Sequence, residues 1–327
     1  MRALLYCAGG GIGDSLVASV VARALHQKYE VVDALTLPGH RATLERVPDV
    51  DGVLADDGEP ERALADALSL RSYDLCVVTW ATSRTARVPQ LARIPVRVGQ
   101  ARRIYSFRFT QAVPIRSETG DVTSHWSDIL LDYARAAGCD TPDRAYRFAP
   151  TAQDEEEARA IADENFVILN PCNAVASKRG IWPVEGWVKL ALQLQDRFGG
   201  RVLVSGSPAD APIADAVESA AHRDTIVSIA GELGIGAFGA LAKRARGFVG
   251  ITTGSMHVAA AVGCPTVGIF PFQTDYPDRW APLGARTAVV RPSYPCHKGD
   301  TKENCRDYAC VASLEVTRIV AAAESIL

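Results

Sequence analysis

The feature that most constrains the fold is a repeated alternation of short apolar runs with longer amphipathic segments along all 327 residues. Apolar runs of this length predict buried strands, and the segments between them have the apolar spacing of helices. This alternation is typical of βα units built around a mostly parallel sheet. In the first half we expect strands at 3–7, 31–37, 52–55, 75–79 and 96–99, and helices most clearly at 15–28, 60–70 and 123–137.

The alternation pauses at residues 143–165, which hold a proline and a helix that begins after Thr151 but no apolar strand. We therefore place a domain boundary at 149–151. Strands are expected again at 166–170, 201–205, 247–250, 266–270 and 288–291, with helices at 184–198, 209–221 and 313–327. The sequence predicts an α/β fold of two Rossmann-like domains, 1–150 and 151–327, which face across a central cleft lined by the carboxyl ends of both sheets. The last helix could pack back on the first domain.

The composition is that of an ordinary soluble globular protein, with 48% hydrophobic and 22% charged residues. The first residues read as a strand that stops at three glycines, not as a signal peptide, and no apolar stretch is long enough to span a bilayer. We therefore expect a cytoplasmic protein. The net charge of −3 argues against general binding of nucleic acid.

Three of the eight cysteines cluster near the C-terminus, at Cys296, Cys305 and Cys310. They lack the closely spaced pair of a structural zinc site and are one ligand short of four, although His297 could complete the set. Free thiols or a local disulfide fit this spacing better than a metal. The pair Asp49 and Asp51 resembles a metal-binding motif, but it precedes a strand and is better explained as a turn.

The segment 80–117 contains eight arginines and no acidic residue. Such a patch either attracts an anionic partner or forms a solvated face that pairs with acids from elsewhere in the chain. The residues alone do not separate these two interpretations. The arginine side chain matches the geometry of phosphate and carboxylate groups.

The loop after the first strand reads Gly9-Gly10-Gly11-Ile12-Gly13-Asp14-Ser15. It lacks the glycine spacing of a dinucleotide-binding loop, and Asp14 stands where the last glycine would be. A carboxylate there would repel a pyrophosphate. Asp14 either points into the cleft as a general base toward a hydroxyl or caps a helix that begins at Ser15.

Two loops of the second half are compatible with phosphate. The turn Thr252-Thr253-Gly254-Ser255-Met256-His257 leads from a strand into a helix, whose first amides and partial positive charge suit an anion. An ordinary capped turn would read the same way. The loop 170–183 carries Lys178, which can neutralise a phosphate as a point charge.

In order along the chain, several motifs resemble those of the heptosyltransferase family of glycosyltransferases, glycosyltransferase family 9. They are Gly13-Asp14, Lys178 with Trp182-Pro183, the segment 204–210, Thr253-Gly254 with His257, Gly263 with Pro265, Trp280 with Pro282, and the cysteine-bearing loop 295–310. The combination covers nearly the whole chain, although each motif alone is weak.

The resemblance implies a GT-B fold, no cofactor or obligatory metal, and inverting transfer of a sugar, heptose above all, from a nucleotide diphosphate such as ADP-heptose. The acceptor would be a hydroxyl of an anionic glycan or glycolipid, such as lipopolysaccharide core, with peripheral contact at the inner membrane face. Asp14 matches the family's general base. The first domain would bind the acceptor, and the second would bind the nucleotide sugar. Expected donor-binding residues are Ser177, Lys178, Gly206, Thr252, Thr253, Gly254, Ser255, Met256 and His257, and expected acceptor-binding residues are Gly13, Arg97, Arg102 and Arg103.

One departure from the family pattern concerns Thr252, where the family usually has an aspartate. A hydroxyl can still hydrogen-bond a sugar but cannot act as a charged acceptor. The altered turn keeps open an alternative, a nucleotide-sugar-binding or assembly protein without transferase activity. A different GT-B enzyme, such as a nucleotide-sugar epimerase, is a third hypothesis. A nicotinamide-dependent dehydrogenase is the weakest, because the glycine spacing is wrong.

Overall fold

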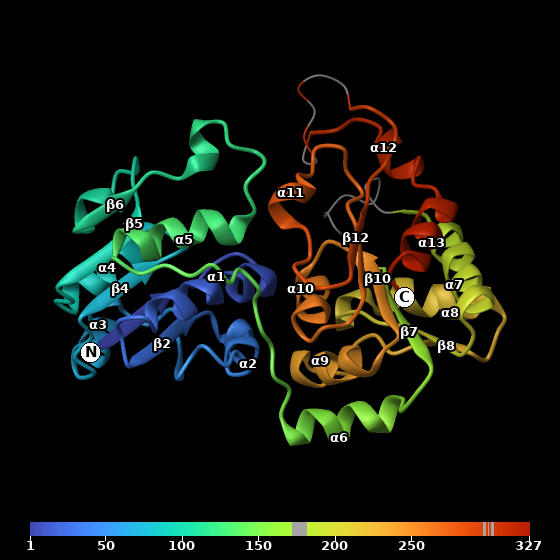
Figure 1. Cartoon of the computed structure of the whole chain (residues 1–327), viewed down its shortest axis with the longest axis horizontal. Coiled ribbons are helices and arrows are strands. Elements are labelled where there is room, and N and C mark those ends of the chain that lie inside the picture. The colour runs from blue at the N-terminus through green and yellow to red at the C-terminus, as the bar shows by residue number, and fades with distance from the viewer. Residues whose placement is uncertain (172–181, 297–298, 300, 302–303) are drawn as a thin grey trace. The chain divides into compact units, whose positions relative to one another are not determined.

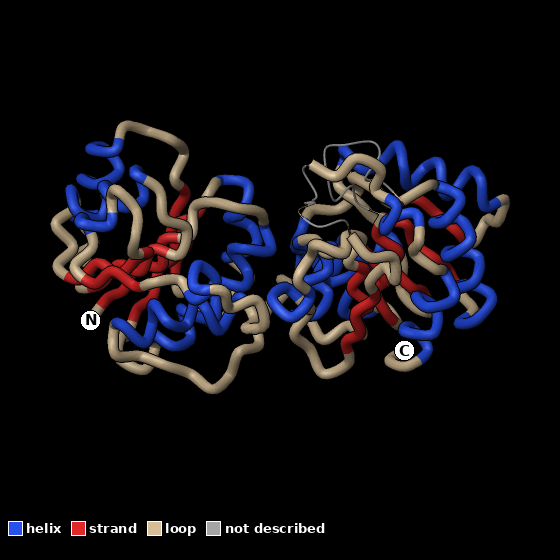
Figure 2. Tube along the Cα trace, turned by 90° about the horizontal axis from the view of Figure 1, so that it is seen from above, coloured by secondary structure: helices blue, strands red, loops and turns tan. Residues whose placement is uncertain are grey.

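The computed structural model describes residues 1–171, 182–296, 299, 301 and 304–327. The chain divides into two compact units, Met1–Ala149 and Pro150–Leu327. In each unit a parallel sheet lies between layers of helices (Figure 1 and Figure 2). Because helices cover both faces, the strands are buried on both sides and appear in the sequence as continuous apolar runs. The predicted α/β class, with two Rossmann-like sheets, is confirmed.

The first unit holds a six-stranded sheet in the order β3-β2-β1-β4-β5-β6. Its strands are β1 (Arg2–Tyr6), β2 (Val31–Thr36), β3 (Gly52–Ala55), β4 (Leu75–Val78), β5 (Val96–Gln100) and β6 (Gln111–Val113). Its α-helices are α1 (Ile12–Leu25), α2 (Arg41–Leu44), α3 (Glu61–Ser69), α4 (Ser83–Leu91) and α5 (Trp126–Ala136), and its short 3-10 helices are η1 (Pro38–His40), η2 (Ser106–Arg108) and η3 (Arg116–Thr119). The strand order reverses between β1 and β4, the place where such sheets open a crevice at their carboxyl edge.

The second unit repeats this topology in the described residues, with the order β12-β11-β10-β7-β8-β9. Its strands are β7 (Phe166–Asn170), β8 (Arg201–Val204), β9 (Ile226–Ser228), β10 (Gly247–Ile251), β11 (Thr266–Ile269) and β12 (Thr287–Val290). Its helices are α6 (Ala152–Ile161), α7 (Val184–Phe198), η5 (Pro208–Asp210), α8 (Ala211–Ala221), α9 (Ile235–Arg244), α10 (Gly254–Ala261), α11 (Pro277–Trp280), α12 (Ala309–Ala312) and α13 (Val316–Glu324). Here the order reverses between β7 and β10.

The last helix packs on its own unit. α13 contacts α7, β11 and β12, and its Ile319 and Ala323 are fully buried in the core that also holds Trp187 of α7. These two residues lie one turn apart and form one apolar face of the helix. The expectation that this helix packs back on the first domain stays a prediction.

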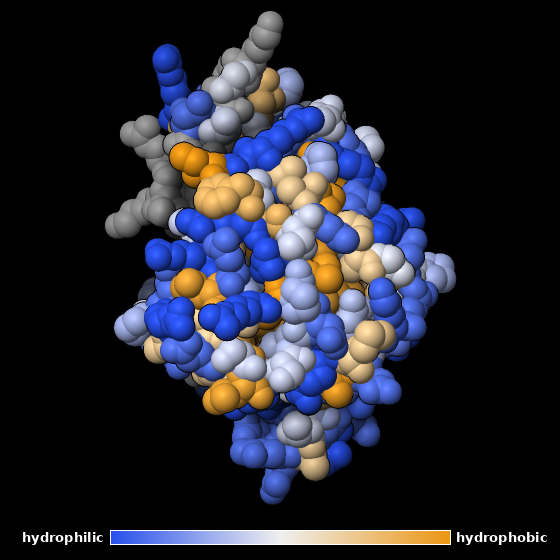
Figure 3. Space-filling view, turned by 90° about the vertical axis from the view of Figure 1, so that its left-hand side faces the viewer, coloured by the Kyte–Doolittle hydropathy of each residue, from blue (hydrophilic) through white to orange (hydrophobic). Residues whose placement is uncertain are grey.

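The surface of the first unit seen in Figure 3 carries hydrophobic residues in small separate patches among hydrophilic ones. Single exposed apolar residues of this kind are common on folded proteins. Among the described helices, none is both long and apolar enough to cross a membrane.

Candidate functional site

Asp14 lies at the carboxyl edge of the first sheet, where the strand order reverses. The helix α1 begins at Ile12, three residues earlier than expected, so Asp14 is the third residue of its first turn. The Oδ2 atom of Asp14 accepts a hydrogen bond of 2.7 Å from the amide of Gly11. Asp14 therefore does cap the helix, and the same contact fixes its carboxylate.

The glycines before Asp14 make room for two side chains. A Cβ atom at Gly9 would lie 2.0 Å from the indole of Trp80, and one at Gly10 would lie 2.5 Å from Oδ2 of Asp14. Gly10 also has a φ of 67°, which favours glycine. The first two glycines are thus explained by close packing, of Gly9 against Trp80 and of Gly10 against Asp14.

Its own burial and two neighbouring groups shift the pKa of the Asp14 carboxyl group. Burial raises the pKa of Asp14 above its ordinary range, while the Gly11 amide and the nearby His40 act in the opposite direction. His40 ends η1, and its Nδ1 lies 2.9 Å from the hydroxyl of Ser15. Burial lowers the pKa of His40, and Asp14 opposes that shift. A carboxylate with a raised pKa is better suited to accept a proton near neutral pH.

Aromatic side chains line a small pocket beside Asp14. Its walls are Cys7, Gly9, Asp14, Thr79, Trp80, Trp126 and Leu130. Thr79 and Trp80 follow β4, and Trp126 opens α5. Sequence reasoning missed both tryptophans and His40, although Trp80 directly follows a strand predicted to end at this edge.

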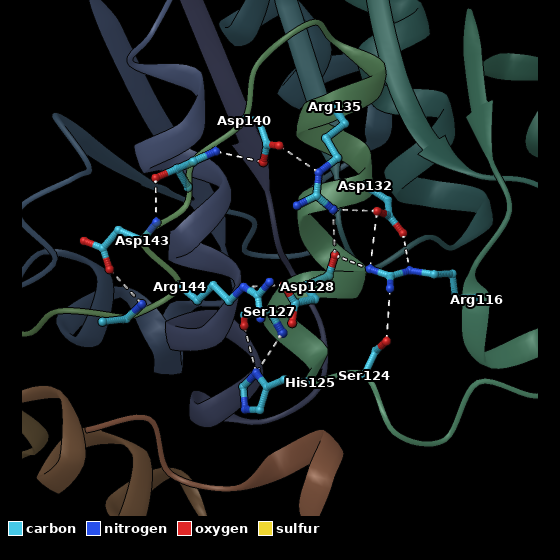
Figure 4. A network of polar contacts seen from close by, with 12 residues as sticks. Arg116, Ser124, His125, Ser127, Asp128, Asp132, Arg135, Asp140, Asp143 and Arg144 are labelled. Carbon is cyan, nitrogen blue, oxygen red and sulfur yellow. Dashed lines mark hydrogen bonds and ion pairs between the residues drawn. The ribbon is translucent and has the colours of Figure 1, made fainter. Parts of the chain in front are cut away.

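A polar network anchors α5, which supplies Trp126 and Leu130 (Figure 4). The guanidinium of Arg116 donates 2.7 Å to Asp132 and 2.8 Å to the carbonyl of Asp128. Arg144 pairs with the Asp128 carboxylate at 2.7 Å, and Arg135 joins Asp132 to Asp140. The network holds the helix that forms one wall of the pocket.

The arginine-rich segment is largely paired within the first unit. Arg84, Arg87, Arg103 and Arg116 form ion pairs with acidic residues. Arg97 donates to the carbonyls of Ile94 and Arg108, so part of its guanidinium has a structural role, and its role in binding an acceptor stays a prediction. Gly13 is buried in α1, whereas Arg102 and Arg103 are exposed. For half of the segment's arginines the interpretation as a face paired with acids is therefore correct.

The carboxyl ends of β7, β8 and β10 lie side by side in the second unit. Gly250 of β10 pairs with Asn170 of β7, and a Cβ atom at Gly250 would lie 2.7 Å from Cβ of Asn170. The side-chain amide of Asn170 donates 2.9 Å to the hydroxyl of Ser205, which follows β8. Asn170 was not expected at the site, although its place at a strand end before a proline is visible in the sequence.

The first turn of helix α10 has backbone amides that donate to no group in the described part of the chain. Thr253 precedes the helix with extended backbone, and the amides of Met256 and His257 return to its carbonyl. The amides of Gly254 and Ser255 have no acceptor among the residues that the structure describes. Thr252, Thr253, Gly254 and Ser255 are all partly exposed. This helix start can therefore receive an anion.

The remaining residues that were expected to bind the donor differ from the start of α10 in their burial and contacts. Met256 is fully buried, and a Cβ atom at Gly268 would lie 2.7 Å from its sulfur. Its side chain therefore belongs to the core, and a role of Met256 in binding the donor stays a prediction for its backbone. His257 is buried as well. The turn at Gly206 is closed by Asp210, which accepts from the amide and hydroxyl of Ser207. Ser177 and Lys178 lie outside the described residues.

The other polar motifs do not form a metal site in the described part of the chain. Cys296, Cys305 and Cys310 line one small pocket and form no disulfide with one another. No group of three metal-ligating side chains occurs among the described residues, which do not include His297. Asp49 pairs with Arg23 at 2.7 Å, and Asp51 accepts from the amide of Val32. These two carboxylates are structural, as the interpretation of this pair as a turn predicted.

Comparison with known proteins identifies relatives along the whole chain. The model of glycosyltransferase family 9 (heptosyltransferase) matches residues 61–309. Lipopolysaccharide heptosyltransferase 2 of Escherichia coli strain K12 is 24% identical over 316 residues, which cover 89% of this chain and 89% of that protein. The structure of ADP-heptose LPS heptosyltransferase II from E. coli matches with a TM-score of 0.82 at 20% identity, over 100% of this chain and 98% of that one. E. coli heptosyltransferase WaaC with ADP-2-deoxy-2-fluoro heptose matches with a TM-score of 0.74 at 17% identity, over 99% of both chains.

Proposed function

We propose, from the premise that this chain belongs to glycosyltransferase family 9 (heptosyltransferase) and has the GT-B fold, that it transfers heptose from ADP-heptose with inversion. The acceptor would be a hydroxyl of an anionic glycolipid such as lipopolysaccharide core. The solved structure of E. coli heptosyltransferase WaaC with ADP-2-deoxy-2-fluoro heptose supports this donor class. Family and fold make the chain a glycosyltransferase; the sugar, the acceptor and the stereochemistry are the proposal.

The observation that carries the proposal is the environment of Asp14. Its carboxylate is fixed by the Gly11 amide, and burial raises its pKa at a partly exposed position. As the acceptor oxygen attacks the anomeric carbon, Asp14 would take the hydroxyl proton. The bond from that carbon to the diphosphate oxygen would break at the same time. A single displacement of this kind inverts the anomeric centre.

The leaving ADP would be held by the second unit. The amides of Gly254 and Ser255 suit the developing negative charge, because helix starts favour anions without a metal ion. Lys178 would add a positive charge, and Ser177 and Gly206 would contribute to the same pocket. Thr252 and Thr253 can offer hydroxyls to the sugar, whereas the backbone is the part of Met256 that can contribute.

The acceptor would bind to the first unit from the inner membrane face, with the protein on the cytoplasmic side. The exposed Arg102 and Arg103 can meet negative groups of a glycolipid. Gly13 would contribute only through backbone, because it is buried in the first turn of α1.

The test is the substitution Asp14→Asn, which keeps an oxygen for the Gly11 amide but removes the base. Turnover with ADP-heptose and a lipopolysaccharide-core acceptor should fall about 10²- to 10⁴-fold, while the affinity for ADP measured by calorimetry stays unchanged. The matched control is Asp66→Asn, an exposed acid of α3, which should leave turnover unchanged. Unchanged turnover in Asp14→Asn would remove its role as base. Donor binding by the natural protein without product would favour the nucleotide-sugar-binding alternative.

A further inference from the structure

The crossover 101–110 joins β5 to β6 (Figure 1). It carries two large apolar side chains that are exposed. Ile104 is 93% exposed and Phe107 is 73% exposed. A single exposed apolar residue needs no explanation, but here two large ones stand within four positions. Their exposure suggests a surface that is covered in the working protein.

Hydrogen bonds and one buried aromatic ring hold the crossover 101–110 on the first unit. The hydroxyl of Tyr105 donates 2.6 Å to the carbonyl of Ala81, and that of Ser106 donates 2.7 Å to the carbonyl of Gln100. Phe109 is buried over Gly99, where a Cβ atom would lie 2.3 Å from the ring. Residues that fix the segment to the unit therefore alternate with exposed apolar residues. Because the segment is already fixed, little conformational entropy is lost when a partner covers it.

The charged side chains of the crossover itself are all arginines, although one of them, Arg103, is paired with Glu118. Arg102 is exposed, and the guanidinium of Arg108 lies 4.7 Å from the centre of the Phe107 ring. No acidic residue occurs between 80 and 117. Apolar anchors beside arginines match the interface of an anionic bilayer, where rings and aliphatic chains enter the headgroup region and guanidinium groups meet phosphates.

The position of the crossover connects it to the candidate site. It leaves the carboxyl end of β5, the edge of the first sheet at which Asp14 also lies. Tyr105 is bonded to Ala81, the residue after Trp80, and Trp80 lines the Asp14 pocket. A surface that meets the crossover therefore meets the edge of the sheet that would receive an acceptor.

We propose that Ile104 and Phe107, flanked by Arg102 and Arg108, form a docking surface for an anionic lipid bilayer. The inference rests on the proposed function, because docking to a membrane would bring the protein to a lipid-linked acceptor. The binding itself needs neither donor nor acceptor, so the two proposals can fail separately.

The experiment is sedimentation of the full chain with vesicles of phosphatidylcholine alone or mixed equally with phosphatidylglycerol. We expect binding to the mixed vesicles that weakens with salt, and little binding to phosphatidylcholine. The double substitution Ile104→Ser with Phe107→Ser should reduce binding at least about tenfold, since each buried side chain contributes more than one factor of ten. The matched control is Leu70→Ser, which removes a side chain that is 86% exposed after α3, at the amino edge of the sheet.

The charge contribution is tested by Arg102→Gln, which should weaken binding to mixed vesicles about fivefold. Arg318→Gln, the same change on an exposed position of α13, should have no effect. The proposal is overturned if the natural protein ignores mixed vesicles, or if the double variant, shown by circular dichroism to be folded, sediments as the natural protein does.

A soluble, delipidated acceptor separates this surface from the acceptor site. The double variant should transfer sugar to it as fast as the natural protein does. A loss of this transfer would assign Ile104 and Phe107 to acceptor recognition and overturn the docking role. If no protein transfers sugar while sedimentation follows the expected pattern, the proposed function fails and the docking surface stands.

Discussion

At the scale of single residues, Asp14 forms a structural hydrogen bond but lies where burial disfavours its ionised form. The Gly11 amide stabilises its ionised form, but burial has the larger effect and raises its pKa. The charged carboxylate is therefore held in a place that favours the protonated acid. Such a cost at a partly exposed position is a sign of function, because selection for stability alone would remove it.

This cost predicts how stability varies with pH. Because the folded-state pKa of Asp14 lies above the unfolded value, its contribution is fully present below the unfolded pKa and is lost as pH rises through the folded pKa. At neutral pH the variant Asp14→Asn should therefore melt at a higher temperature than the natural protein, and the difference should shrink at acidic pH. Thermal unfolding across this range checks the sign. A variant that is less stable at neutral pH would contradict it.

Gly10 offers a second residue-scale prediction. Alanine at this position would combine the strain of a positive φ with a contact of 2.5 Å to the Asp14 carboxylate. The control is Gly58→Ala, since Gly58 has a φ of 81° but no heavy atom near a new Cβ. Both variants should lose about 1–3 kcal/mol of stability, but turnover should fall only in Gly10→Ala. Equal turnover in the two variants would mean that the position of Asp14 does not depend on Gly10.

At the scale of elements, the start of α10 carries the next prediction. Proline is compatible with position 254, because it is the first residue of the helix and Thr253 before it is extended. Gly254→Pro removes one amide donor and adds a Cβ atom, whereas Gly254→Ala adds the Cβ atom and keeps the donor. Calorimetry should show an affinity for ADP about tenfold lower for proline than for alanine. Equal affinities would exclude this amide from the diphosphate site.

The sequence predicted those elements whose apolar pattern is strong. The central strands and α7 were expected because buried parallel strands and amphipathic helices carry a clear period. Helix α4 was missed, since it has two arginines and an internal proline and begins with the polar cap of Thr82 and Thr85. Helix α9 was missed because it contains Gly236 and Gly239, and β6 because it has three residues at the sheet edge.

The candidate site was predicted in the same uneven way. Asp14 and the α10 turn could be proposed from the sequence because glycines and hydroxyls at a strand-to-helix junction are a local signal. His40 could not be found, since only the fold brings it to Ser15. The structural contacts of Arg97 could not be predicted either, because its acceptors are backbone carbonyls, which no side-chain pattern reveals.

At the scale of the whole molecule, the two units share one topology but differ in charge at the helix that starts beside the strand reversal. In the first unit, the helix start at the strand reversal carries Asp14, whose negative charge repels a diphosphate. In the second unit, the corresponding start of α10 has no acidic residue in its first turn and two amides without acceptors among the described residues. This difference supports the proposal that the donor diphosphate binds to the second unit and that the proton is transferred in the first.

The contact between the Gly11 amide and Asp14 bears on regiochemistry. The hydroxyl groups of a sugar differ little in acidity, so a base that accepted protons from any direction could not choose among them. Because the Gly11 amide already holds one lone pair of Oδ2, the orientation of the carboxylate is fixed, and a hydroxyl would have to approach one of the remaining lone pairs. The linkage formed would then be decided by which hydroxyl of the acceptor can align with that lone pair.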